Sequence, residues 1–66
     1  MLKIGDHVKW RFQNGETHGI IIKIHTSDFT FMNRQRRASE AEPQYEVMSE
    51  KTGKTAAHKA SALKKI

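Results

Sequence analysis

The dipeptide Asn14-Gly15 is the sequence feature that most restricts the fold of this chain. It separates two runs rich in β-favouring residues, "HVKWRFQ" (7–13) and "ETHGIIIKIH" (16–25). Both central residues of a type I′ turn need a positive φ, which Asn and Gly adopt more readily than other residues. The dipeptide therefore predicts a β-hairpin that begins close to the N-terminus.

A two-residue turn at this dipeptide also predicts the register of the hairpin. The facing pairs would be Gln13–Glu16, Trp10–Gly19 and Val8–Ile21. The large indole would then lie over a residue without a side chain. The same register would place one set of apolar residues on a single face of the hairpin: Val8, Trp10, Phe12 and Ile21.

Three further isoleucines would point to the opposite face, beside His7 and Lys9: Ile20, Ile22 and Ile24. A flat hairpin with one buried face does not explain two apolar faces. A long, twisted strand with a β-bulge does, because the bulge shifts the alternation and lets the strand serve two sides of a small barrel. We therefore expect a curled barrel strand here.

Shorter alternating runs predict two more strands, Phe29–Phe31 and Tyr45–Met48, and residues 49–54 read as a turn with Gly53 at positive φ. Short strands at this spacing indicate an all-β barrel. The C-terminal segment "TAAHKASALKKI" (55–66) is ambiguous, because Ala56, Ala60 and Leu63 also fit the period of a helix.

The size and composition of the chain narrow its class. Its 66 residues leave room for one small domain, residues 1–66. The absence of cysteine excludes disulfides and thiolate zinc sites and favours a reducing cytoplasm. A charged residue follows too early in the first ten residues for a signal peptide. The longest apolar run, Ile20–Ile22, is too short to span a membrane, so no membrane association is expected.

The chain is basic, and its positive charge is concentrated in the C-terminal half. Twelve Lys and Arg residues stand against seven Asp and Glu residues, which gives a formal net charge of +5. The segment 51–66 contains lysines but no carboxylate side chain. Such an asymmetry attracts polyanions, although it says little about the fold.

Two C-terminal blocks, "ASEAEPQYEV" (38–47) and "KTGKTAAHKASAL" (51–63), together with "IGDHVKW" and "HGIIIKIH" near the N-terminus, resemble the hypervirulence-associated Tudor-like domain family of small bacterial proteins. The resemblance implies an SH3-like, Tudor-type barrel of about five strands. It implies a strand at Thr55–Lys59, a short 3-10 turn at 60–63 and a closing strand at 64–66. No catalytic or binding residue is implied, because the name of the family records a genetic association and not an activity.

The stretch "RQRRASEAE" (34–42) allows two interpretations. Its three arginines could clamp phosphate groups through their guanidinium forks. Alternatively, Glu40 and Glu42 could fold back on the arginines and leave a solvated loop that neutralises itself. Exposed ion pairs of this kind contribute only about 0 to 1 kcal/mol, so a phosphate could still compete for the arginines. Pro43 makes a turn more plausible than a helix here.

Catalytic, metal and cofactor sites are not expected. The four histidines, His7, His18, His25 and His58, show no metal-ligand spacing. Asp28, Ser39 and a histidine supply the residue types of a catalytic triad, but the sequence contains no nucleophile elbow to support one. The sequence Gly53-Lys54-Thr55 lacks the earlier glycine that a phosphate-binding P-loop requires.

The aromatic residues are assigned mainly to the core, because they alternate within the predicted strands. A cage for methylated lysine would need several rings that converge at a loop-rich end. Trp10 and Tyr45 are the two exceptions that could be half exposed and stack on a nucleobase or a proline.

Two functional hypotheses follow, and both describe a non-enzymatic binding module. In the first, the domain contacts nucleic acid or another polyanion, with Trp10 or Tyr45 available for stacking. The basic residues predicted to make phosphate contacts are Arg34, Arg36, Arg37, Lys54, Lys59, Lys64 and Lys65. In the second, an aromatic groove or a barrel edge binds an acidic or proline-rich protein partner.

Overall fold

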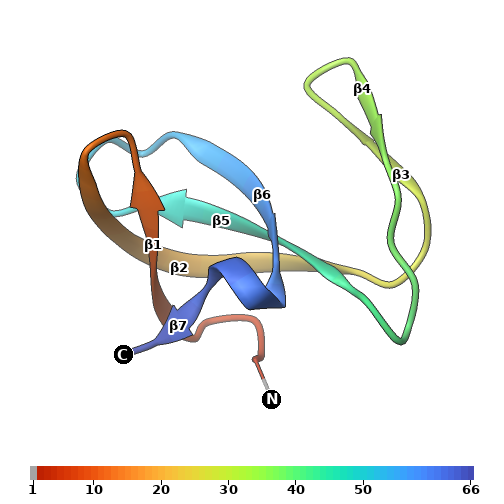
Figure 1. Ribbon diagram of the computed structural model, residues 1–66, viewed down its shortest axis with the longest axis horizontal. Coiled ribbons are helices and arrows are strands. Elements are labelled where there is room, and N and C mark those ends of the chain that lie inside the picture. Colours follow the sequence, from red (N-terminus) through yellow and green to blue (C-terminus); the bar gives the residue numbers. More distant parts are fainter. Residues whose placement is uncertain (1) are drawn as a thin grey trace.

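The computed structural model describes residues 2–66 as seven strands and one 3-10 turn, and the all-β prediction is confirmed (Figure 1). The elements, in chain order, are β1 (His7–Phe12), β2 (Gly15–His25), β3 (Phe29–Phe31), β4 (Arg34–Arg36), β5 (Gln44–Ser49), β6 (Thr55–Lys59), η1 (Ala60–Ala62) and β7 (Lys64–Lys65). The strand, the 3-10 turn and the closing strand implied by the family resemblance for residues 55–66 are all present. The helical alternative for this segment is wrong.

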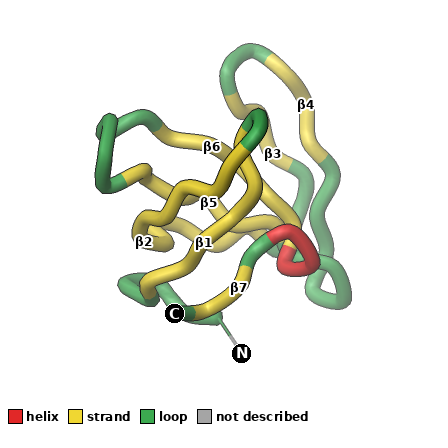
Figure 2. Tube along the Cα trace, turned by 60° about the vertical axis from the view of Figure 1, so that its left-hand side comes forward, coloured by secondary structure: helices red, strands yellow, loops and turns green. Residues whose placement is uncertain are grey.

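Five of the strands form one curved antiparallel sheet in the order β6-β5-β2-β1-β7. The remaining two, β3 and β4, form a separate hairpin that projects away from β7 (Figure 1). The edge strands β6 and β7 are joined by η1, and β7 pairs only with Val8 and Lys9 of β1. The rest of the outer edge of β1 therefore has no strand partner within residues 2–66. Figure 2 shows β7 and η1 beside β1.

The first hairpin forms as predicted, but its predicted register is wrong by two residues. The turn residues are Gln13 and Asn14, with Gln13 at a φ of 54°, and Gly15 is already the first residue of β2. Val8 therefore faces Gly19, and Trp10 faces Thr17.

Gly19 lies at a close contact between β2 and β5. A Cβ atom on Gly19 would lie 1.9 Å from the carbonyl oxygen of Met48 in β5. Only a glycine fits where β2 passes so close to the β5 backbone. In the observed register of the hairpin, Val8 lies opposite this glycine.

The predicted β-bulge is confirmed, and it explains how Ile24 reaches the core. Ile21 pairs with Val47 and Lys23 with Glu46, so Ile22 is the extra residue. Beyond the bulge the alternation is reversed, which brings Ile24 opposite Tyr45 and against the core. Ile22 itself is exposed.

The core consists of apolar side chains from three strands, β1, β2 and β5, and from the segment before β7. Its buried members are Val8, Trp10, Ile21, Tyr45, Val47 and Leu63. Phe12 was expected to share this face, but it is 59% exposed, because it lies at the end of β1 beyond the core and faces Gly15, which has no side chain to cover it.

The β3–β4 hairpin was only half predicted. β3 was expected, whereas the pairing of Arg34–Arg36 with it was not. The turn between them consists of Met32 and Asn33, both at positive φ (51° and 63°), as a type I′ turn requires. Asn33 was the available signal, because Asn tolerates this conformation better than most residues.

Candidate functional site

Two hollows lie on either side of a ridge formed by Trp10 and His58, and both residues line each of them. The ring centroids of Trp10 and His58 are 5.7 Å apart. The ridge joins β1 to β6 across the interior of the sheet. The side chains around it therefore come from segments that are far apart in the sequence.

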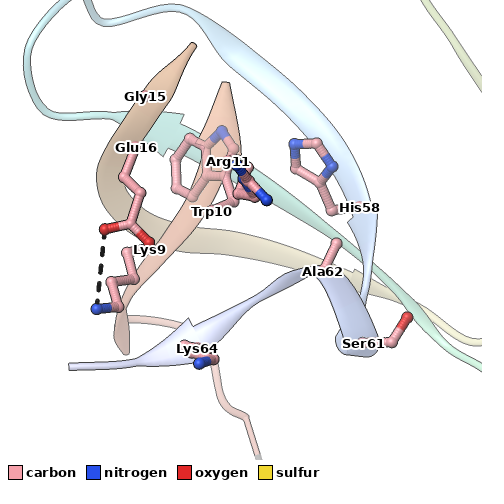
Figure 3. Close-up of a pocket in the computed structure, with 9 residues that line it drawn as sticks. All are labelled: Lys9, Trp10, Arg11, Gly15, Glu16, His58, Ser61, Ala62 and Lys64. Atoms are coloured by element: carbon pink, nitrogen blue, oxygen red, sulfur yellow. Dashed lines mark ion pairs between the residues drawn. The ribbon is translucent and has the colours of Figure 1, made fainter. Parts of the chain in front are cut away.

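The first hollow has a volume of about 600 Å³ and opens between β1, β6, η1 and β7 (Figure 3). It exists because β7 covers β1 only as far as Lys9, which leaves a gap beside the rest of the strand. Besides His58, its polar lining residues are Lys9, Arg11, Glu16, Ser61 and Lys64.

The second hollow has a volume of about 490 Å³ and lies between the end of β1, the start of β2 and the β5–β6 turn. The exposed ring of Phe12 and two lysines, Lys51 and Lys54, form part of its wall. Four hydroxyl side chains line it as well: Thr17, Ser49, Thr52 and Thr55.

The electrostatic character of the two hollows is strongly positive. Their linings include five cationic side chains, Lys9, Arg11, Lys51, Lys54 and Lys64, and one carboxylate, that of Glu16. The Glu16 carboxylate lies 3.9 Å from the Lys9 ammonium and is exposed. A pair of this kind contributes little, so the surface keeps its excess of positive charge.

Of these five cationic residues, the sequence predicted Lys54 and Lys64 and missed Lys9, Arg11 and Lys51. Lys9 and Arg11 alternate with Trp10 in β1, so strand periodicity assigns them to the opposite face. Both line the first hollow, which opens where the pairing of β7 with β1 ends at Lys9 and leaves the edge free beside Arg11. The single available signal was the basic character of "VKWRF" itself.

His58 is the least usual polar residue of the site. Its Nε2 atom is buried and has no hydrogen-bond partner within residues 2–66. Burial of the ring, and to a smaller extent the charge of Arg36, lowers the pKa of His58 below its ordinary value of 6.5. The ridge therefore holds a neutral imidazole at neutral pH.

We expect His58 to make the fold less stable in acid. Because the unfolded chain binds the proton at a higher pH than the folded chain does, the stability attributable to His58 is complete above about pH 6.5 and is lost as the pH falls. Urea unfolding of the wild type and of His58→Gln between about pH 5 and pH 8 measures this difference. The variant should show a weaker loss of stability on acidification, and identical pH dependence in the two proteins would contradict the assignment.

Trp10 and Tyr45 are core residues, 5% and 4% exposed respectively. Both rings are almost completely buried, and this burial argues against stacking on a base or a proline. A methyl-lysine cage is equally unsupported, because the exposed aromatic ring near the ridge, Phe12, stands among lysines.

Two of the three arginines of 34–37, Arg36 and Arg37, are joined to the start of β5 and not to the neighbouring glutamates. The Gln44 side chain accepts a hydrogen bond from Arg36 Nη1 (3.3 Å) and donates one to the Arg37 carbonyl (2.8 Å). Within residues 2–66 no ion pair joins these arginines to Glu40 or Glu42, so the self-neutralising loop is wrong. The expected turn is present, with the Glu42 amide donating to Ser39 Oγ at 3.0 Å.

The basic positions predicted from the sequence do not form one cluster. Lys54 and Lys64 lie at the hollows, whereas Arg34 and Arg36 lie on the projecting β3–β4 hairpin. Lys59, at the end of β6, pairs with Gln44 and so lies near the base of that hairpin. Lys65 lies 3.7 Å from the Asp6 carboxylate.

The other histidines are paired with carboxylates. His25 stacks on Phe29 with ring centroids 3.6 Å apart and contacts Glu46, which attaches β3 to the sheet. His7 and His18 approach opposite oxygens of Glu50 at 2.9 and 3.1 Å. In the part of the chain that the structure describes, no three or more histidine or carboxylate side chains are grouped so that they could hold a metal ion. Residues 2–66 also contain no helix that is long and apolar enough to cross a membrane.

The model of one protein family, described as "Hypervirulence associated proteins TUDOR domain", matches residues 5–63. The chain belongs to this family. The match covers both hollows of this Tudor domain except for Lys64. Searches of curated proteins and of solved structures return no match. The family identifies the Tudor domain as a small binding module, and the partner has to be inferred from its surface.

Proposed function

We propose that this Tudor domain binds a polyanion, nucleic acid in the first place, through the two hollows beside the Trp10–His58 ridge. The observation that carries the proposal is the charge of the linings, five cations against one carboxylate. Lysine and arginine side chains bind phosphate groups through charge-assisted hydrogen bonds. A cytoplasmic location, which the absence of cysteine favours, would give the domain access to nucleic acid.

The basic residues outside the hollows have a secondary role in this proposal. Arg34, Arg36, Arg37 and Lys59 gather near the β3–β4 hairpin, where they would contact phosphates further along a bound strand. Arg36 is the least available of these, because it is half-buried and its guanidinium group lies 6.0 Å from the centre of the Phe31 ring. Lys65 would contribute weakly because of its proximity to Asp6.

Reversal of two charges at the hollows tests the proposal. Lys54→Glu combined with Lys64→Glu should lower the affinity for a labelled oligonucleotide at least about tenfold at low salt. The slope of log affinity against log salt concentration should fall in magnitude by about 2, since two phosphate contacts are lost. Fluorescence anisotropy at several salt concentrations provides both quantities.

The matched control is Lys3→Glu combined with Lys23→Glu, which changes the net charge equally at exposed positions that line neither hollow. A loss of affinity equal to that of the first variant would show that only overall charge matters. Absence of binding by the wild type at low salt would refute the proposal altogether.

A protein partner is the less well supported alternative. A proline-rich segment would need the ring faces of Trp10 and Tyr45, which are buried. An acidic protein would use the same hollows as nucleic acid, and a pull-down from lysate with and without nuclease separates the two. Partners that stay bound after nuclease treatment would favour the acidic protein.

A further inference from the structure

Phe12 is an exposed aromatic side chain placed at the edge of a basic hollow. It is 59% exposed, and it lies on the same face of β1 as the buried residues Val8 and Trp10. Its cross-strand partner is Gly15, and a Cβ atom at Gly15 would meet no atom within 4 Å. The ring of Phe12 therefore has open space beside it.

The surroundings of Phe12 suit one nucleotide. The second hollow, with a volume of about 490 Å³, falls within the range of pockets that bind small ligands, about 300 to 1,000 Å³. Lys51 and Lys54 supply positive charge beside the ring, and the hydroxyl groups of Thr52 and Thr55 supply hydrogen-bond donors and acceptors. An aromatic ring among cations is the arrangement that binds a base and its phosphate together.

The form of the nucleic acid follows from the geometry of stacking. In a duplex the base faces are covered by neighbouring bases, whereas in a single strand they are free to stack on a protein ring. We propose that the ligand of this domain is single-stranded nucleic acid, with one base stacked on Phe12 over the second hollow and its phosphates at Lys51 and Lys54. The phosphate contacts rest on the proposed function, and the stacking contact is the new element.

Binding of a single strand and of a duplex of the same sequence, each about 12 nucleotides long and prepared as DNA and as RNA, tests this inference. The wild type should prefer the single strand in at least one of the two chemistries. Phe12→Ala should weaken binding of that single strand at least about 5-fold. Phe12→Trp should retain the affinity, and Phe12→Leu, which keeps an apolar side chain without the ring, should lose it as the alanine variant does.

Ile4→Ala is the matched control, since Ile4 is 63% exposed and lines neither hollow. Circular dichroism should show that all variants are folded. Equal binding of duplex and single strand, with Phe12→Ala equal to the wild type, would overturn the stacking inference and leave the polyanion proposal standing. Failure of the wild type to bind either form at low salt would overturn both.

Discussion

Replacement of Gly19 by alanine should unfold the domain or bring it close to unfolding. The added Cβ atom would lie 1.9 Å from the Met48 carbonyl oxygen and 2.7 Å from the Met48 carbonyl carbon. Both atoms belong to the backbone of β5, so no side-chain rotation relieves the overlap. β2 and β5 would have to separate, and the ladder between them contains the pair of buried core residues Ile21 and Val47.

The expected cost is about 3 kcal/mol or more, the upper end of the range for overpacked sites. A domain of this size has a total stability of only about 3 to 10 kcal/mol. Urea unfolding followed by circular dichroism measures the change. Gly15→Ala is the matched control, because a Cβ atom there meets nothing within 4 Å, and it should unfold at nearly the same urea concentration as the wild type. Equal midpoints for Gly19→Ala and the wild type would contradict the close approach.

Replacement of Trp10 by alanine should be the most damaging change to a core side chain. Trp10 is 5% exposed, packs with the core cluster and forms the ridge with His58. Truncation of a buried tryptophan costs about 3 to 5 kcal/mol, because the contacts are lost and the space is only partly refilled. The two hollows would also merge where the indole now separates them.

Thermal unfolding followed by circular dichroism tests this prediction, since Trp10 is the sole tryptophan and its fluorescence is lost in the variant. Phe12→Ala is the comparison, because Phe12 lies two residues further along the same strand and face. Removal of its exposed ring should lower the free energy of unfolding by less than about 1 kcal/mol. Similar losses in the two variants would mean that Trp10 is less well packed than the structure indicates.

The two basic hollows show why a charge count along the sequence identifies a binding surface only in part. Lys54 and Lys64 were selected because they belong to a segment without carboxylates, and they lie at the hollows. Arg34 was selected because its stretch contains three arginines, and it lies on a projecting hairpin. The sequence shows which residues are basic, whereas the fold decides which of them lie at the same surface.

Phe12 and Trp10 illustrate the same limit for aromatic residues. Both alternate on one face of β1, so periodicity assigns them the same environment. Trp10 is covered by β6 and the core, while Phe12 extends past the end of that cover. Burial depends on what lies across from a side chain, and this information is not contained in the strand itself.

The amino-acid sequence by itself determined the features that depend on neighbouring residues. These are the first hairpin, the bulge in β2, the β-strand character of Phe29–Phe31 and Tyr45–Met48, and the positive φ of Gly53. Each follows from turn chemistry or from the alternation of apolar side chains, which act over a few residues.

The tertiary structure alone decided the register of that hairpin, the course of the arginine-rich segment and the position of the two hollows. In the observed register Val8, and not Trp10, lies opposite Gly19, where the backbone of Met48, distant in the chain, leaves no room for a side chain. The first hollow exists because β7 is too short to cover the edge of β1, and the second lies where β1, β2 and the β5–β6 turn meet. Such features arise where separate strands meet, so the physical interactions that fix them form only when the whole sheet has folded.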